Sequence, residues 1–485
     1  PGIIRSAGLP KLAVVLVLSL VLASSCLTVR RVWLTRRAAF LAPLLVYLLI
    51  TAAQAARCSN PAEGLLVLAA QTAFAMVCAT TACLVRPGRE MSLIRFSAVA
   101  GIGVACMGIL EHLGVSWSTL PSAGRPSATF GFRNTAAAYL AINLPLSAAL
   151  WLETRRRDWV LGAVSTGLML AFLMLTRTRG AWVGLSTAAV IGLLVALWMR
   201  ARAERSLAGE IWSRLSPVRR CAIAGCLALG LAMAWLPAGF ADRGLQRLDE
   251  KKTGVAATVT SMVSEHGDRG RLRVWRHSLE MIADRPMIGV GLENWSVHYP
   301  RYDRGDVLVL PSDPQRPHND FLWIWSELGT VGLLVYLWFL FVVGIEVVRR
   351  LKEGEEDERA LALFLGVAML AYLGHSVFSF PREQAAPSLL FWMAAGLIGR
   401  PRRRAGIEAL TVGAAIRACA GLGTVVAAAA CVICIEALRA DRHLAGAMAA
   451  REAGAWREQA ERAQEALDRG CFSHRAYLML GHARH

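Results

Sequence analysis

Long apolar runs separated by short polar stretches occupy most of the chain. A helix of about 20 apolar residues crosses the hydrocarbon core of a bilayer. A helix also satisfies its backbone groups within one segment, whereas an open sheet does not. The pattern therefore predicts an all-α, polytopic membrane protein with about 12 spanning helices. We expect these spans at 11–29, 38–56, 62–85, 91–114, 134–152, 159–176, 180–199, 221–239, 319–348, 360–380, 387–400 and 406–438.

Composition and charge support this class of protein. The chain has 485 residues, of which 55% are hydrophobic and only 18% are charged. A water-soluble fold of this length needs more charge to cover its surface. The net charge of +18 does not mark one nucleic-acid-binding face, because the arginines form short clusters after every second span. The clusters lie at 30–37, 86–89, 155–157, 200–220, 349–352 and 400–404. We expect them to face the cytoplasm. The lipid bilayer is the expected partner of the spanning helices.

The same alternation predicts the location of the remaining segments. The hydrophilic stretch 240–318 is expected outside the cytoplasm. It contains an amphipathic segment at 271–284, in which Leu272, Trp275, Leu279 and Ile282 recur at helical spacing. The first span would run inward, and because the chain starts at Pro1 we expect a preceding helix to be missing. The predicted organisation is N-terminal spans at 1–114, a core at 115–400 that includes the 240–318 loop, a last span at 401–438 and an exterior helical tail at 439–485.

The tail has the pattern of a helix pair. Small residues recur at helical intervals from Ala449 to Ala466, and the chain turns near Gly470 before a second helix from Ser473. This resembles the start of tetratricopeptide-type repeats. Two interpretations stay open: more repeats follow, or the segment is an amphipathic tail.

Two arginines lie at the exterior end of a span, against the charge bias of the other loops. They are Arg177 and Arg179, in the sequence Thr-Arg-Thr-Arg-Gly that precedes Trp182. Ionisable groups at the membrane are costly and are candidates for function. The alternative is that both side chains extend to the interface beside Trp182. We favour a functional role, with Arg179 the stronger candidate.

The exterior loop contains a second arginine cluster. Arg271 and Arg273 begin the amphipathic segment and can point to different surfaces. Guanidinium groups match phosphate oxygens with two parallel hydrogen bonds, so arginines at two edges of a cavity can hold a diphosphate without a metal. The alternative is that this cluster, with Arg269 and Arg276, attracts anionic lipid headgroups.

The loop ends in Pro317, His318 and Asn319, directly before a span that contains Glu327. A histidine at a helix start is commonly a cap, but at the membrane surface a neutral imidazole can also accept the proton of a sugar hydroxyl. Glu327 requires a polar partner within the span. The sequence has no nucleotide-binding G-x-x-x-x-G-K-[ST] loop, no H-E-x-x-H and no D-x-D. We therefore expect a donor that is already in the membrane.

Four stretches together resemble the O-antigen ligase and polymerase superfamily of bacterial membrane glycosyltransferases. They are Thr-Phe-Gly-Phe-Arg-Asn at 129–134, Arg-Thr-Arg-Gly-Ala-Trp-Val-Gly-Leu at 177–185, Arg-Leu-Arg-Val-Trp at 271–275 with Asp-Arg-Pro-Met-Ile-Gly-Val-Gly at 284–291, and Pro-His-Asn-Asp-Phe-Leu at 317–322 with Glu-Leu-Gly-Thr-Val-Gly at 327–332. Each stretch is weak alone, but their order and spacing make the set fairly specific across about 120–380.

The resemblance implies a metal-independent, inverting transfer from an undecaprenyl-diphosphate-linked glycan, without a cofactor, on the periplasmic side of the inner membrane. It implies that Arg179 and Arg271, with Arg177, bind the donor diphosphate, and that His318 activates the acceptor hydroxyl. Further candidates for supporting roles are Arg133, Asn134, Arg273, Asn319 and Glu327.

Several functions stay open. A ligase would use lipid A core or a protein as acceptor, whereas a polymerase would use a second lipid-linked repeat unit. A transporter of a small solute or a lipid-linked sugar predicts charged residues near the midplane and related broken helices in two halves of the chain. A non-enzymatic scaffold built around the tail would leave Arg179, Arg271 and His318 free to vary.

Overall fold

The computed structural model describes residues 2–28, 31–33, 41–86, 88–115, 126–202, 207–235, 270–303, 314–400, 409–411, 414–469 and 479–481. The predicted all-α, polytopic membrane class is confirmed. Among the described residues, eight helices are long and apolar enough to cross a membrane: Glu63–Leu84, Glu90–His112, Arg133–Leu152, Arg156–Leu175, Arg179–Met199, Asp320–Glu353, Glu356–Ser376 and Gly423–Arg451. Shorter apolar helices cover Leu9–Leu22, Leu41–Ala55 and Ala385–Gly399.

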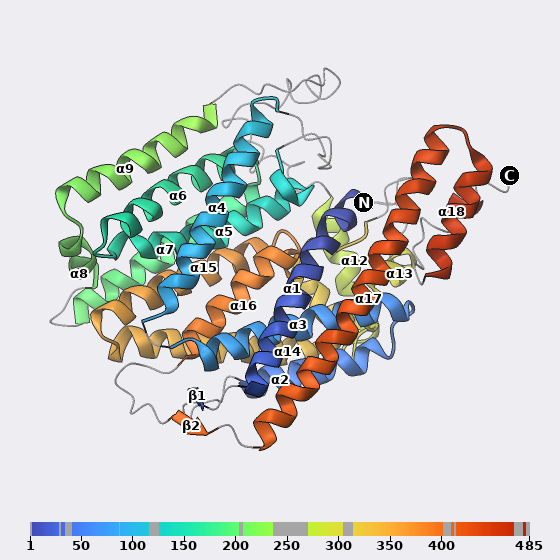
Figure 1. Ribbon diagram of the computed structural model, residues 1–485, viewed down its shortest axis with the longest axis horizontal. Helices are drawn as coiled ribbons and strands as arrows, with labels where there is room; N and C mark the ends of the chain where they lie inside the picture. Colours follow the sequence, from blue (N-terminus) through green and yellow to red (C-terminus); the bar gives the residue numbers. More distant parts are fainter. Residues whose placement is uncertain are drawn as a thin grey trace.

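Each expected span contains a helix, but the helix in 221–239 is not among these apolar helices, and residues 409–411 of the span expected at 406–438 form a strand. The order of the helices along the chain can be followed in Figure 1. Up to the long loop the elements are α1 (Gly2–Thr28), β1 (Arg31–Trp33), α2 (Leu41–Ala55), α3 (Pro61–Leu84), α4 (Glu90–His112), η2 (Ala128–Phe130), α5 (Arg133–Ala148), η3 (Ala149–Leu152), α6 (Arg156–Leu175), α7 (Arg179–Arg202), α8 (Leu207–Arg214), α9 (Pro217–Ala232) and η4 (Met233–Trp235).

The second half begins with the described part of the exterior loop and ends in the helical tail. Its elements are α12 (Arg271–Asp284), α13 (Trp295–His298), η5 (Tyr299–Arg301), α14 (Asp320–Glu353), α15 (Glu356–Ser376), η6 (Pro381–Glu383), α16 (Ala385–Gly399), β2 (Ala409–Thr411), α17 (Ala414–Glu452) and α18 (Trp456–Asp468). Strands β1 and β2 form a short antiparallel pair that the sequence pattern did not predict.

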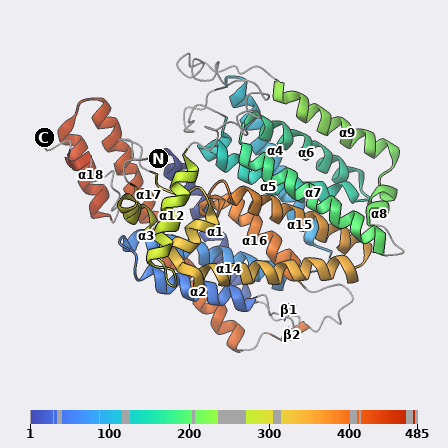
Figure 2. The same ribbon diagram turned by 180° about the vertical axis from the view of Figure 1, so that it is seen from behind.

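The spanning helices form one bundle in which α5 and α16 lie at the centre. In α5 every residue from Thr135 to Ala148 is buried. Helix α1 packs along α17, α7 along α15, and α6 between α4 and α9. Helices α5, α7, α12 and α14 begin at the end of the bundle where α15 finishes, which we call the site end; Figure 2 shows α12 at this end, next to the start of α14. The opposite end, where α4 begins and α5 finishes, is called the network end.

Helices α7 and α15 approach each other through glycines. A Cβ atom at Gly184 would lie 2.7 Å from the backbone nitrogen of His375, and one at Gly180 would lie 2.9 Å from Cβ of Phe378. Lipid tails are as apolar as leucine, so helix association in a membrane depends on this kind of close packing. The glycines therefore fix the start of α7 against the end of α15.

Helix α14 is broken at Gly329, where φ is 71° and ψ is −176°. The loop before α13 crosses this break: the backbone of Val290 donates to Ser326 O at 2.8 Å, and that of Thr330 donates to Pro286 O at 2.8 Å. A Cβ atom on Gly329 would lie 2.2 Å from Met287 O, so only glycine fits. The motif segments 284–291 and 327–332 thus form one packing unit.

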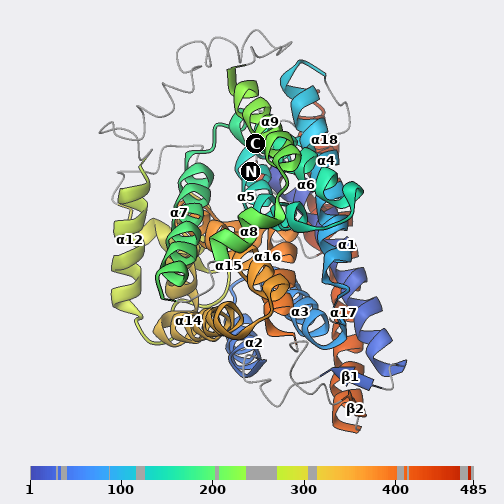
Figure 3. The same ribbon diagram turned by 90° about the vertical axis from the view of Figure 1, so that its left-hand side faces the viewer.

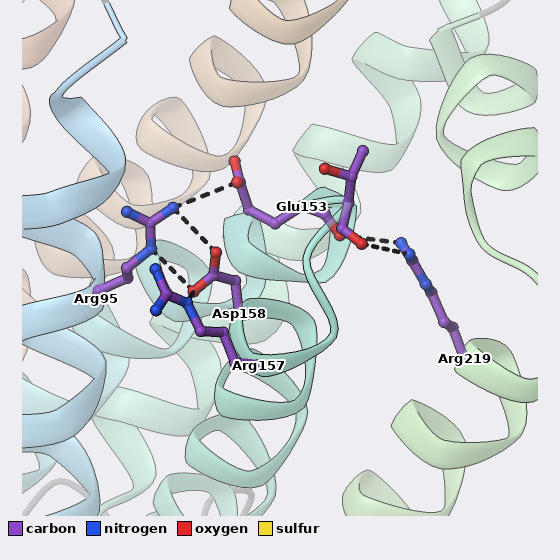
Figure 4. Close-up of polar contacts among 6 residues, drawn as sticks. Arg95, Glu153, Arg157, Asp158 and Arg219 are labelled. Carbon is purple, nitrogen blue, oxygen red and sulfur yellow. Dashed lines mark hydrogen bonds and ion pairs between the residues drawn. The ribbon is translucent and has the colours of Figure 1, made fainter.

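Ion pairs at the network end connect α4, α6 and α9 (Figure 4). The Arg95 guanidinium donates to both carboxylate oxygens of Asp158 at 3.1 Å and to Glu153 at 3.4 Å. Arg219 donates to the carbonyl oxygens of Glu153 at 3.0 Å and Thr154 at 3.1 Å. Since Asp158 is only 2% exposed, these contacts supply the partners that a buried carboxylate requires.

The amphipathic segment expected at 271–284 is α12, with the same bounds. Of the expected pattern only Ile282 is fully buried, and the other buried residues are Val274, His277, Ser278 and Met281. Leu272 and Leu279 are exposed, because α12 packs on α14 through the neighbouring stripe. Figure 3 shows α12 at the edge of the molecule. Residues 240–269 and 304–313 of the loop lie outside the described residues.

The last spanning helix, α17, begins at Ala414 and continues to Glu452, beyond the expected end at 438. It forms an antiparallel hairpin with α18 that projects past the other helices (Figure 1). Apolar contacts join Leu444 and Ala447 of α17 to Ala463, Ala466 and Leu467. The helix predicted from Ser473 falls mainly on residues that are not described.

Candidate functional site

The start of α12 is held beside the residue before His318. Gly270, with φ of 78°, precedes the helix, and Arg271 is its first residue. The indole nitrogen of Trp275 donates to Pro317 O at 2.9 Å, and the Trp275 ring lies 6.4 Å from that of Phe378. These contacts bring the first turn of α12 close to the end of α15. Arg271 is half-buried, whereas Arg273 is exposed.

His318 occupies an unusual backbone conformation, with φ of 54°. Non-glycine residues adopt this left-handed region at a cost, and such residues cluster at functional sites. The half-buried ring lies 5.1 Å from the ring of Phe380. Burial, followed by the positive charges of Arg271 and Arg316, lowers the pKa of His318 to about 4, although Glu383 acts in the opposite direction. The imidazole is therefore neutral at pH 7.

Arg271 and His318 lie near each other at the site end, because the indole of Trp275, one turn after Arg271, donates to the carbonyl oxygen of Pro317. Arg271 is close enough to His318 for its charge to depress the pKa of the imidazole, although the two residues are far apart in the sequence. This is the proximity that a diphosphate-binding arginine and a proton acceptor would need in one site.

The starts of α5 and α7 form the second part of the site end. Thr178 Oγ1 donates to Asn134 Oδ1 at 3.3 Å, which connects the two helices. Arg177 has φ of 52°, so a second candidate residue also lies in the left-handed region. Arg133, Asn134, Arg177 and Arg179 are all half-buried. The structure thus places these four candidates at the same end as Arg271 and His318.

Two candidates have clear structural contacts. Asn319 caps α14: its Oδ1 accepts hydrogen bonds from the backbone of Phe321 at 2.9 Å and of Leu322 at 3.1 Å. Glu327 is 1% exposed, and its Oε1 accepts from the backbone of Trp295 at 3.2 Å. Both residues hold the segments on either side of His318.

A cluster of charged residues that includes Arg316 and Glu383 was not predicted from the sequence. Arg316 donates two hydrogen bonds to the Glu383 carboxylate, at 2.9 and 2.7 Å, and lies 3.9 Å from Glu293. Burial lowers the pKa of Arg316, but the carboxylates outweigh burial and hold that pKa above its usual value. The segment 314–318 is thereby fixed to the connection between α15 and α16.

Arg316 and Arg382 both lie against the ring of Trp323. The guanidinium carbons of Arg316 and Arg382 are each 4.9 Å from the ring centre of Trp323. The backbone nitrogen of Arg382 donates to Asp320 Oδ2 at 3.1 Å. The ionisable residues at 382 and 383, directly after an apolar run, are the signal that could have revealed this cluster.

His375, in the last turn of α15, is a further residue that the sequence analysis missed. It is 1% exposed and lies against Gly180 of α7. The charge of Arg271 also reaches it. An ionisable side chain within a predicted span is the signal that could have identified this residue.

Comparisons with known proteins agree with the predicted resemblance. The O-antigen ligase family model matches residues 164–337, a range that begins within α6 and ends within α14. It includes Arg179, Arg271 and His318, whereas Arg133 and Asn134 precede it. The family description names a ligase, which supports the coarse prediction of an enzyme.

One curated relative is the exopolysaccharide production protein ExoQ of Rhizobium meliloti (strain 1021). It is 26% identical over 283 residues, which cover 57% of this chain and 59% of the relative. The chain thus spans well under two thirds of the relative's length. Both comparisons confirm the resemblance, and residues 164–337 are similar to the O-antigen ligase family.

Proposed function

We propose that this chain is a membrane glycosyltransferase, which transfers a glycan from undecaprenyl diphosphate to an acceptor hydroxyl on the periplasmic face of the bacterial cytoplasmic membrane. The observation that carries the proposal is the position of the first turn of α12 beside His318, where Trp275 donates to Pro317 O at 2.9 Å, together with the neutral imidazole of His318. The acceptor is lipid A core, a protein or a growing polysaccharide.

The orientation follows from the arginine clusters. Arg86, Arg89 and Arg155 to Arg157 lie near the network end. Basic residues are retained on the cytoplasmic side. The site end, with Arg271 and His318, then faces the periplasm, where a lipid-linked donor can reach it from the membrane.

The proposed reaction is a single displacement. The oxygen of the acceptor hydroxyl bonds to the anomeric carbon of the donor sugar, and His318 takes the hydroxyl proton. The bond between that carbon and the diphosphate oxygen breaks, and its electron pair leaves with undecaprenyl diphosphate. Arg271 and Arg179 stabilise the charge that develops on the diphosphate. Attack opposite the leaving group inverts the anomeric configuration, and no metal takes part.

The low pKa of His318 couples proton transfer to donor binding. Burial, followed by the positive charges of Arg271 and Arg316, opposes protonation of the His318 imidazole. A bound diphosphate would offset those charges and raise the pKa of His318 towards its ordinary value. His318 then becomes a stronger base only when the donor is in place.

The test uses the full chain, purified in detergent, with an undecaprenyl-diphosphate oligosaccharide, candidate acceptors and either EDTA or no chelator. We expect glycan transfer and release of undecaprenyl diphosphate in both conditions. His318→Ala and Arg271→Ala should lose nearly all activity. Arg276→Ala is the matched control, because Arg276 is exposed on the same helix and pairs with Glu280. Requirement for a metal, or normal turnover in folded His318→Ala, contradicts the proposal.

A polymerase is the second candidate, and the name of the relative favours it, because that protein is described by exopolysaccharide production. A polymerase incubated with a lipid-linked repeat unit alone yields a ladder of longer glycans. A ligase yields product only when a separate acceptor is added. The transporter alternative predicts movement of solute across a vesicle membrane without any new glycosidic bond.

A further inference from the structure

His375 has a buried imidazole that the protein itself does not satisfy. The residue is 1% exposed. Within the part of the chain that the structure describes, neither Nδ1 nor Nε2 makes a hydrogen bond. Buried polar groups in native proteins nearly always have partners, so an exception requires an explanation. One explanation is that a ligand supplies the partner.

The ring lies among the residues that we expect to bind the donor. A Cβ atom at Gly180 would be 3.4 Å from His375 Nδ1, and Gly180 directly follows Arg179. The backbone groups of Gly180 and Asn134 lie beside the ring, although neither ring nitrogen has a hydrogen-bond partner among the described residues. Arg271 approaches from α12, close enough for its charge to act on the imidazole. Three separate helix starts therefore surround this one side chain.

A second buried histidine shows that burial alone does not leave an imidazole without a partner. His277 in α12 is 5% exposed, and its Nδ1 lies 3.1 Å from the hydroxyl of Tyr299. The imidazole of His277 therefore has a hydrogen-bond partner within the exterior loop. His375 differs from it in having arginines and helix starts around the ring in place of a hydroxyl partner.

We propose that His375 is a further donor-binding residue, whose ring N–H donates a hydrogen bond to a phosphate oxygen of the undecaprenyl diphosphate. This inference rests on the function proposed above. A phosphate oxygen is the ligand atom that fits best, because the charge of Arg271 reaches the ring and the residue next to Arg179 contacts it. Hydrogen bonds to charged phosphate oxygens are among the strong ones. His375 would hold the diphosphate from the side of the membrane interior.

Binding measurements on the full chain in detergent test this role, with undecaprenyl diphosphate and undecaprenol as the two probes. We expect His375→Leu to weaken affinity for the diphosphate about tenfold or more, because it removes one hydrogen bond to a charged group. His375→Gln keeps a donor and should lose less. His277→Gln is the matched control and should bind the diphosphate as the wild type does.

Thermal stability without ligand separates a binding role from a structural one. Replacing an unsatisfied buried polar group by an apolar group of similar volume is neutral or stabilising. We therefore expect ligand-free His375→Leu to melt at or above the temperature of the wild type, while its diphosphate affinity falls. A lower melting temperature with unchanged affinity overturns the proposal.

The outcomes also distinguish this inference from the proposed function. If Arg271→Ala loses diphosphate binding while both His375 variants bind normally, His375 is excluded and the glycosyltransferase proposal stands. If the wild type binds undecaprenol as tightly as undecaprenyl diphosphate, both proposals fail. Should the variants not fold, NMR of wild-type protein labelled on its histidine rings decides: the diphosphate should protect one further ring N–H from exchange, and no added protection overturns the inference.

Discussion

Both ends of the bundle hold buried ionisable side chains, but these side chains have different partners at the two ends. At the network end, Arg95 donates to both carboxylate oxygens of Asp158, and Arg400 pairs with Glu90 at 2.9 Å. The site end also has a charge pair, between Arg316 and Glu383. In addition, His318 adopts a left-handed backbone there, and the His375 nitrogens have no hydrogen-bond partner among the described residues.

The comparison indicates that polar groups have different roles at the two ends of the bundle. Charge pairs with good geometry close the network end and hold α4 against α6. Strained backbone and unsatisfied polar groups lower stability and persist where a function requires them. We therefore expect substitutions at the network end to change stability, and those at the site end to change binding and turnover.

The largest effect is expected for His318→Ala. Loss of a general base lowers turnover by about 10²- to 10⁴-fold. Alanine meets the same strain in the left-handed region as histidine, so thermal stability should stay close to that of the wild type. Turnover and melting temperature of the same purified variant check both parts. If His318→Ala lowers the melting temperature while its folded fraction turns over at the wild-type rate, His318 is a structural residue. The proposed difference between the two ends would then be wrong.

The sequence predicted the helices well because apolar length is a local property. Each of the expected spans contains a helix, and the motifs around Arg179, Arg271 and His318 all lie at one end of the bundle. What it could not predict is which partners the tertiary fold brings together. The Arg316 pair with Glu383 joins residues far apart in the sequence.

His375 and α12 show why the remaining misses occurred. His375 lies in an apolar run, so composition alone counted it as part of a span, and its contact with Gly180 depends on the packing of two helices. In α12, the stripe with Leu272 and the stripe with Val274 both have helical periodicity. Only the packing against α14 decides that Val274 is buried.

A substitution at the break of α14 should have the next largest effect. Gly329→Ala forces a side chain into a left-handed backbone and places its Cβ against Met287 O. We expect the free energy of unfolding to fall by about 2 kcal/mol or more. Thermal melting in detergent measures this loss.

Gly344→Ala is the matched control in the same helix, because a Cβ there meets no atom within 4 Å. Alanine is the better helix former by about 1 kcal/mol, so this control should be neutral or stabilising. Equal melting temperatures for the two variants would show that the loop at 284–291 is not fixed by the break in α14.

A smaller effect is expected at the network end. Arg95→Ala leaves the buried Asp158 without its main cation and should lower the free energy of unfolding by about 1–3 kcal/mol. Turnover per folded molecule should stay at the wild-type level. Arg157→Ala is the control, since Arg157 is exposed and lies 3.5 Å from the same carboxylate; its effect should be about 0–1 kcal/mol. Loss of turnover in Arg95→Ala would break the division between the two ends.

The smallest effect is a shift in the titration of His318. Burial and the charges of Arg271 and Arg316 hold its pKa at about 4, so the imidazole stays unprotonated between pH 5 and 7. Diethyl pyrocarbonate modifies unprotonated imidazole. The rate of modification at His318, measured by peptide mass spectrometry, should therefore show no decrease from protonation of this ring between pH 7 and pH 5. Arg271→Gln removes a positive charge, which raises the pKa towards its ordinary value, so the modification rate should fall as the pH is lowered. Arg276→Gln should behave as the wild type. A wild-type rate that already falls between pH 7 and pH 5 would mean that Arg271 does not act on His318, and the link between donor binding and proton acceptance would lose its physical basis.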